Sequence, residues 1–231
     1  NKPFMKLCGA TFLVFNGYQI VASFSFFIFV FYIFNGSYDA TSTWPAWFSS
    51  IGALVSAFLV IPIVTKMATK WGKKNAFLIS TFLSIIGYAM KWWAFTPENV
   101  WLSFIPIPLM SFGLGSLFTL MMSMTADVCD LDELTNGMPR KEGTFGALYW
   151  WVVKLGQGLA LVLGGAVLKA IGFDGNAATQ TVETLTQLRI ADIVIPVVTA
   201  GLAIWIMWKY DLSEEKAKEI KTKLEARRGV L

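Results

Sequence analysis

Residues 143–168 read GTFGALYWWVVKLGQGLALVLGGAVL, and Lys154 carries the only charge in this stretch. A run of about 20 apolar residues is long enough to cross the hydrocarbon core of a bilayer as a helix. An ammonium at membrane depth costs roughly 2.5 to 3.5 kcal/mol on insertion scales, so it usually faces a cavity or a partner. The stretch therefore predicts a membrane-spanning helix, and Lys154 is the first candidate for a functional residue.

The whole chain has the composition of an integral membrane protein. Hydrophobic residues make up 55% of its 231 residues and charged residues only 15%, which is far from the balance of a soluble domain. Six windows are long and apolar enough to span a bilayer, and they cover residues 8–34, 46–65, 76–95, 101–126, 145–170 and 191–209. We therefore predict an all-α, polytopic protein with six transmembrane helices.

Positive charge gathers on one side of the predicted bundle. The basic residues of its loops and termini on that side include Lys2, Lys6, Lys66, Lys70, Lys73, Lys74, Arg140, Lys141 and Lys209. Because short cytoplasmic loops carry the excess of Lys and Arg, we expect both termini in the cytoplasm and a multi-pass location in the cytoplasmic (inner) membrane. This bias and contact with anionic lipid explain the net charge of +4, so no nucleic-acid partner is expected.

The end of the chain reads as a cytoplasmic amphipathic tail helix. Ser213 is a good N-cap, and Gly229 can end the helix. Its narrow apolar stripe consists of Leu212, Ile220 and Leu224. We therefore divide the chain into a six-helix transmembrane part, residues 1–210, and a tail, residues 211–231, that rests on the cytoplasmic face.

Residue types that enzymes use are scarce. The absence of histidine removes the Ser-His and Cys-His dyads and the usual proton switch. Cys8 and Cys129 fall near the predicted cytoplasmic face, where thiols stay reduced, so neither a disulfide nor a metal cluster is expected. Acidic residues gather at helix ends, and Asp192 comes nearest to membrane depth but opens the sixth predicted span. We expect no enzyme activity, no metal site and no carboxylate deep in a span.

Small residues recur every four positions in the fourth and fifth predicted spans. These stripes consist of Ser111, Gly115, Thr119 and Ser123, and of Gly156, Ala160 and Gly164. Such stripes let helix backbones approach closely in lipid, so ordinary helix packing explains them. The alternative is that the fourth and fifth spans pack beside each other or line a cavity.

Opposite charges flank the short loop between the fourth and fifth spans. They belong to Asp127, Asp130, Glu133, Arg140, Lys141 and Glu142. One interpretation is a solvated charged loop, because exposed ion pairs contribute little. The other is a set of gating ion pairs that closes the cytoplasmic side in one conformation and separates in another, as rocking transporters require.

Three sequence elements around this loop resemble a known family. They are Ala126-Asp127-Val128-Cys129-Asp130 with Glu133, then Arg140-Lys141-Glu142-Gly143, then Val152-Val153-Lys154-Leu155-Gly156. In this order they are similar to the C-terminal half of the glycoside-pentoside-hexuronide:cation symporters, a family of the major facilitator superfamily that includes the melibiose permease. A further element that looks like a loop of this superfamily is Lys70-Trp71-Gly72-Lys73-Lys74.

The resemblance implies that the chain is the C-terminal half, helices seven to twelve, of a twelve-helix transporter. It begins with Asn1 rather than Met, so we expect a half or fragment of a longer protein. The implied activity is cation-coupled symport of a sugar or glycoside by alternating access, without a cofactor. No set of oxygen ligands for the coupling cation, Na⁺ or H⁺, is visible here, so the missing N-terminal half is expected to bind it.

By the same resemblance, Lys154 lies beside the sugar and interacts with carboxylates of the other half. Tyr149, Trp150 and Val153 would lie on the sugar-facing side of the same helix, and Phe118 matches an aromatic position of the preceding one. Aromatic faces stack on sugar rings, which suits this role. An interfacial aromatic belt is the other explanation for Trp150.

Two further functions stay open on the sequence. The chain could be a six-helix, non-catalytic membrane subunit or channel, and it could pair with a second copy of itself. It could also belong to a transporter of the same fold that carries a lipid or another organic solute. The residues specify neither the sugar nor the coupling ion.

Overall fold

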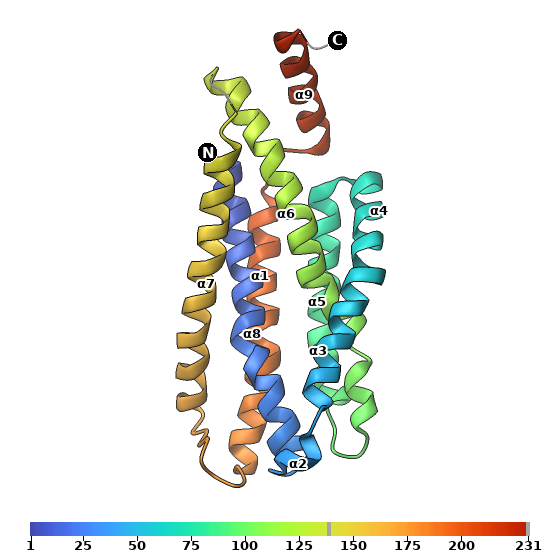
Figure 1. Cartoon of the computed structure of the whole chain (residues 1–231), viewed down its shortest axis with the longest axis vertical. Coiled ribbons are helices and arrows are strands. Elements are labelled where there is room, and N and C mark those ends of the chain that lie inside the picture. Colours follow the sequence, from blue (N-terminus) through green and yellow to red (C-terminus); the bar gives the residue numbers. More distant parts are fainter. Residues whose placement is uncertain (138–139, 230–231) are drawn as a thin grey trace.

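The computed structural model describes residues 1–137 and 140–229, and this part of the chain consists of helices and their connections (Figure 1). The helices are α1 (Lys2–Phe27), η1 (Ile28–Ile33), α2 (Tyr38–Thr41), α3 (Trp44–Val55), η2 (Ser56–Val60), α4 (Ile61–Trp71), α5 (Lys73–Ala94), η3 (Val100–Phe104), α6 (Ile107–Asn136), α7 (Glu142–Ala170), α8 (Val182–Trp208) and α9 (Glu214–Arg228). The π-helical segments η1 and η2 continue the helices on either side of them, so α1–η1 and α3–η2–α4 each form one rod.

In the part of the chain that the structure describes, six helical segments are long and apolar enough to cross a membrane. They are Lys2–Ile33, Tyr38–Trp71, Lys73–Ala94, Val100–Asn136, Glu142–Ala170 and Val182–Trp208. The predicted all-α fold with six spans is therefore confirmed, and the protein is a multi-pass integral membrane protein. Each segment is longer than its apolar window, because the helices continue into polar residues at their ends.

The sixth span begins earlier than predicted. Thr181 caps α8 by accepting a hydrogen bond from the Thr184 N–H at 3.1 Å, and Glu183 lies in the first turn, where the helix dipole favours an acid. The hydropathy window missed these turns because they are polar. The prediction that Asp192 opens a helix was therefore wrong, since Asp192 lies about 15 Å along α8.

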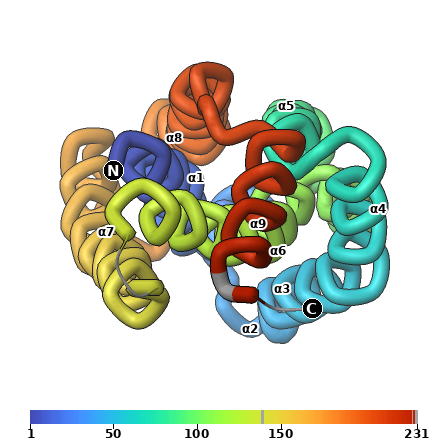
Figure 2. The backbone as a smooth tube through the Cα atoms, turned by 90° about the horizontal axis from the view of Figure 1, so that it is seen from above, coloured from blue at the N-terminus to red at the C-terminus, as the bar shows by residue number. Residues whose placement is uncertain are grey.

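The helices form a bundle with α1 and α6 at its centre. Contacts of α1 with α7 and α8, of α6 with α5, and of α5 with α8 account for much of the packing. In Figure 2, α5 and α8 lie along one side of the bundle and α3 lies on the opposite side. On the side of the bundle opposite α5 and α8, α3 has no buried residue and α7 packs mainly on α1. These two helices leave a broad face of the bundle uncovered by this chain.

The start of α1 and the tail helix α9 lie at the same end of the bundle, which we call the basic end (Figure 1). The turn from α4 to α5 and the connection from α6 to α7 lie at this end as well, so the lysines and arginines predicted to share a side do share it. The assignment of the basic end to the cytoplasm stays a prediction.

Two glycines allow the closest helix contacts. A Cβ on Gly17 of α1 would lie 2.0 Å from the Thr199 Oγ1 and 3.2 Å from the Pro196 Cα of α8. A Cβ on Gly87 of α5 would lie 2.5 Å from the backbone N of Met110 in α6. The α6 backbone thus excludes a side chain at Gly87, and the Thr199 side chain takes up the space at Gly17; such close approach is expected where lipid gives no hydrophobic drive for association.

The predicted small-residue stripes serve helix packing, but not between the helices that carry them. On α7, Gly156 lies against Asn16 of α1, and Gly164 approaches the Ile20 carbonyl oxygen of the same helix. On α6, Gly115 lies against Val60 of η2. The fourth and fifth spans touch each other, but not through these stripes, because each stripe meets a different third helix; Ser111 of the α6 stripe does line a cavity, as the alternative allowed.

The tail helix α9 is attached to the basic end. Ser213 caps it as predicted, accepting a hydrogen bond from the Lys216 N–H at 3.3 Å. The Lys6 Nζ donates a hydrogen bond to the Asp211 carboxylate at 2.7 Å. This bond joins the short connection between α8 and α9 to α1. The predicted apolar stripe is buried in the same core cluster as the ends of α1 and α6, and it consists of Leu212, Ile220 and Leu224. The tail therefore extends the core of the bundle.

Replacing Gly87 with Val should destabilise the bundle, because the new side chain would collide with the α6 backbone at Met110. Overpacking of this kind typically costs about 1–3 kcal/mol. Thermal unfolding of the purified protein in detergent measures the effect. Gly201→Val is the matched control, since a Cβ at Gly201 meets nothing within 4 Å. An unchanged unfolding midpoint for Gly87→Val would contradict the proposed close contact.

Docking of α9 should weaken on acidification. The hydrogen bond from Lys6 holds the pKa of Asp211 below its usual range. A carboxyl whose pKa is lower in the folded state stabilises that state above its unfolded pKa of about 3.9, and the contribution is lost as the pH falls through the folded pKa. Amides of α9 should therefore exchange hydrogen faster in Asp211→Asn than in wild type at neutral pH, with the two converging in acid. Equal exchange at neutral pH would argue against this contact, and Glu215→Gln serves as the control.

Candidate functional site

Lys154 lies on the uncovered side of α7. Its side chain is exposed, and no residue in the described part of the chain forms a hydrogen bond or ion pair with it. The opposite face of α7 is buried on α1 through Gly156 and Ala160. An ammonium in this position must find water or a partner outside this chain, because lipid cannot solvate it.

Tyr149 and Val153 lie in the core rather than beside Lys154. Tyr149 has no exposed surface, and its hydroxyl accepts a long hydrogen bond of 3.4 Å from the Thr11 Oγ1 of α1. Val153, directly before Lys154, is 5% exposed. Both residues occupy the stripe of α7 that faces α1, so Lys154 and they point to different sides of the helix, and their predicted contact with the sugar stays a prediction.

Trp150 and Phe118 do come together at the uncovered face. Their rings stack with centroids 6.1 Å apart and planes 13° from parallel, although they belong to α7 and α6. Phe15 of α1 packs edge-on against Phe118 at 5.8 Å. Trp150 is 43% exposed, and it lies one turn before Lys154 on the same face of the helix. The structure thus places one stacked aromatic pair next to the exposed lysine.

The charged residues flanking the α6–α7 connection form ion pairs at the basic end. Arg140 lies 3.5 Å from both Asp130 and Glu142, so it joins the end of α6 to the start of α7. Asp127 instead pairs with Lys73 of α5 at 2.6 Å. The acids of α6 therefore bind bases from two different connections.

The remaining members of the predicted gating set lie close by. Lys141 forms an ion pair of 3.7 Å with Asp132, which was not part of the predicted gating set. Glu133 lies on the last turns of α6, where its carbonyl oxygen accepts a hydrogen bond from the Gly137 N–H at 3.0 Å. These pairs are partly exposed to solvent, so each contributes little to stability and can separate at low cost. A gating role stays a prediction.

A second polar centre, which sequence reasoning missed, lies inside the bundle. Lys91 of α5 forms an ion pair with Asp192 of α8, and their side chains are 2% and 1% exposed. Ser25 of α1 accepts a hydrogen bond from Lys91 at 2.9 Å and donates one to Asp192 at 3.3 Å. The expectation of no carboxylate deep in a span was wrong, because Asp192 is fully buried among three helices.

Arg189 completes this polar region one turn before Asp192. Its guanidinium donates hydrogen bonds to the Tyr32 hydroxyl at 2.9 Å and to the Trp92 carbonyl oxygen at 2.6 Å. It also stacks on the rings of both residues, 4.2 and 4.4 Å from their centroids. Arg189 thus joins α8 to η1 and α5.

One local signal could have revealed the buried pair. Thr181 followed by Glu183 is a helix-start pattern, and a helix beginning there carries Asp192 into the bundle. Lys91, which lies one turn from the end of α5, then becomes the natural partner. Neither residue identifies the other by sequence spacing, since they belong to helices far apart in the chain.

The described residues contain no group of three or more Cys, Asp or Glu side chains that could hold a metal ion. Where the coupling cation binds therefore stays a prediction from the sequence.

A six-span bundle with an uncovered face, an exposed lysine and stacked aromatic rings at membrane depth has the features of a solute transporter. Comparison with known proteins agrees. Residues 1–214 match the family described as MFS/sugar transport protein, and the chain belongs to this family.

Relatives of this chain include carriers of quite different cargo. The chain is 29% identical to the glucuronide carrier protein homolog of Escherichia coli (strain K12), over 100% of this chain and 48% of that protein. It is 28% identical to the isoprimeverose transporter of Lactiplantibacillus pentosus, over 72% of this chain and 35% of the relative. The sodium-dependent lysophosphatidylcholine symporter 1 of Mus musculus is 22% identical over 91% of this chain and 40% of its own length. The chain spans about half the length of these relatives or less.

Removing one partner of the Lys91–Asp192 pair should destabilise the protein far more than removing both. Lys91→Met or Asp192→Leu alone leaves a buried charge without its counterion, which typically costs about 3–5 kcal/mol. The double variant should recover most of that loss, because an apolar pair avoids the desolvation cost of both charges. Thermal unfolding of the four proteins in detergent measures the coupling. Additive losses in the double variant would contradict a direct buried pair.

Proposed function

We propose that this chain is the C-terminal half of a cation-coupled symporter, driven by Na⁺ or H⁺, that moves a sugar or glycoside by alternating access. The observation that carries the proposal is the exposed Lys154, which has no partner among the described residues and lies beside the stacked Trp150–Phe118 pair on the uncovered face. Aromatic rings can stack on the apolar face of a sugar while an ammonium donates hydrogen bonds to its oxygens.

The uncovered face is itself an argument that a second structural unit packs against this bundle. A lysine at this depth is costly against lipid, so Lys154 is expected to face a water-filled cavity. A further six-helix unit would close such a cavity opposite α7 and α3. The missing N-terminal half is the proposed partner, since the curated relatives are about twice as long as this chain; a second copy is the alternative.

The ion pairs at the basic end are suited to a contact that forms in one conformation and separates in another. Arg140 reaches Asp130 and Glu142 at 3.5 Å, and these groups are partly solvated. Pairs of this kind are weak enough to separate when two halves rock against each other. We propose that they stabilise one of the two alternating conformations of the transporter.

A lipid-like cargo is the second candidate. It is favoured by the similarity to lysophosphatidylcholine symporters and by exposed apolar residues of α7 such as Leu155 and Leu159. We favour a sugar because the exposed lysine and indole offer polar and stacking contacts at one place. A transport panel with glycosides, pentosides, uronides and lysophosphatidylcholine distinguishes the two classes.

Lys154→Ala in the full-length gene product that contains this chain should reduce sugar uptake strongly. A hydrogen bond to a charged group is worth about 1.5–3 kcal/mol, so kcat/KM should fall about tenfold to a hundredfold. Uptake of radiolabelled sugars into proteoliposomes under an imposed Na⁺ or H⁺ gradient measures this. Lys169→Ala is the matched control, because Lys169 is an exposed lysine at the other end of α7.

Normal uptake by Lys154→Ala, with unchanged cation dependence, would count against the proposed site. Uptake of lysophosphatidylcholine without any sugar would replace the sugar class by the lipid class.

A further inference from the structure

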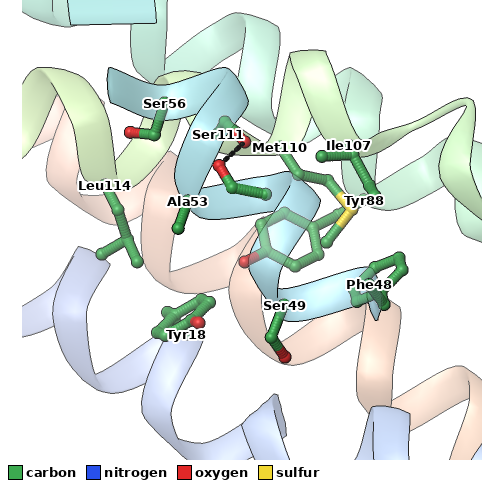
Figure 3. A pocket seen from close by; sticks show the side chains of 11 residues that line it. Tyr18, Phe48, Ser49, Ala53, Ser56, Tyr88, Ile107, Met110, Ser111 and Leu114 are labelled. Carbon is green, nitrogen blue, oxygen red and sulfur yellow. Dashed lines mark hydrogen bonds between the residues drawn. The ribbon is translucent and has the colours of Figure 1, made fainter. Parts of the chain in front are cut away.

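Two adjoining cavities lie between α1, α3, α5 and α6. Their volumes are about 270 and 340 Å³, near the lower end of the range of ligand pockets. Both are lined by Tyr18, Phe48, Ser49, Tyr88 and Met110, so they form one continuous hollow. We call it the Tyr88 hollow, and Figure 3 shows part of its lining.

The walls of the Tyr88 hollow combine rings with hydroxyl groups. Tyr18 and Tyr88 carry both, and Phe48 adds a third ring. The Ser49 hydroxyl donates to the Pro45 carbonyl oxygen at 2.9 Å, and Ser111 makes a longer bond of 3.4 Å to Gly52. Each serine therefore keeps its oxygen lone pairs for a ligand. This mixture suits a molecule with an apolar face and several hydroxyl groups.

Lys91 forms the polar end of the Tyr88 hollow. It lines the larger of the two cavities, although its side chain is only 2% exposed. An ammonium has three N–H donors, and those of Lys91 reach Asp192 and Ser25. No acceptor in the described part of the chain takes the third, so a ligand oxygen can accept it.

The charge of this polar end selects the ligand class. Asp192 already neutralises Lys91, so the polar end has no net positive charge to offset that of a bound anion. A neutral ligand needs no counter-charge and leaves the buried pair intact, whereas an anion would be buried without a counterion.

We propose that the Tyr88 hollow is a second solute site, which binds a neutral, polyhydroxylated molecule of about monosaccharide size. This inference goes beyond the proposed function. None of the residues that line the hollow belongs to α7, and neither Lys154 nor Phe118 contributes to it. The two sites can therefore be tested separately.

Neighbouring serines of α3 provide a matched pair of probes. Ser49 lines the hollow and Ser50 does not, and both side chains are exposed. Ser49→Cys and Ser50→Cys are introduced into the full-length gene product with Cys8 replaced by Ala; Cys129 is fully buried and is left in place. The rate of labelling by N-ethylmaleimide is measured in nanodiscs with D-xylose, D-glucose or D-glucuronate.

The neutral sugars should protect Ser49→Cys. At about twice the Kd, occupancy of about two thirds slows labelling about threefold. Ser50→Cys should label at an unchanged rate, and D-glucuronate should protect Ser49→Cys less well than D-glucose. Adding Ala53→Trp, which fills the hollow, should remove the protection, whereas Lys154→Ala should leave it in place.

Several results would overturn the proposal. The first is that the Ser49→Cys variant is not labelled, and the second is that sugar slows labelling of both cysteine variants equally. The others are that no neutral sugar protects Ser49→Cys, and that the added Lys154→Ala change removes the protection. Failure of the proposed transport function is seen separately, as absence of sugar uptake in proteoliposomes. Protection without uptake would support the hollow and reject the transport proposal, and uptake without protection would do the reverse.

Discussion

The buried ion pair between Lys91 and Asp192 is the interaction on which the arrangement of the helices depends. Each charge is almost completely removed from solvent, so neither can be buried without the other. Ser25 bonds to both side chains, which brings α1 into the same contact as α5 and α8. Fixing these three helices determines which faces of the bundle are covered, and α7 is left as a peripheral helix that packs mainly on α1.

The two lysines at membrane depth therefore have opposite roles. Lys91 is neutralised within the chain, whereas Lys154 has no partner among the described residues. An unpartnered ammonium cannot face hydrocarbon, so the surface of α7 that carries it must meet water or another polar structure. This physical requirement is why the uncovered face, rather than the most buried charges, is the better candidate for the main transport site. In the buried pair, it is Lys91 that lines the Tyr88 hollow, where its third N–H is available to a ligand.

The contacts within the bundle are of two kinds: close helix contacts that leave little freedom, and weak ion pairs at the basic end that can separate. Gly17 and Gly87 bring α1 against α8 and α5 against α6 at distances that leave no room for a side chain. The basic end is joined by partly solvated ion pairs around Arg140, which cost little to separate. The proposed alternating access would require the bundle to move as one body while contacts at its end exchange.

The sequence by itself determined the six spans, the sided distribution of basic residues, the tail helix and the exceptional position of Lys154, because hydropathy and charge are local properties. Only the tertiary structure decided that Tyr149 and Val153 are buried while Trp150 is exposed. Helix α7 is apolar on nearly every face, so its periodicity could not indicate which side meets α1. The structure also decided that Asp192 is interior, since its pairing with Lys91 joins helices distant in the chain. Contacts of that kind arise from packing in three dimensions, and no spacing along the sequence encodes them.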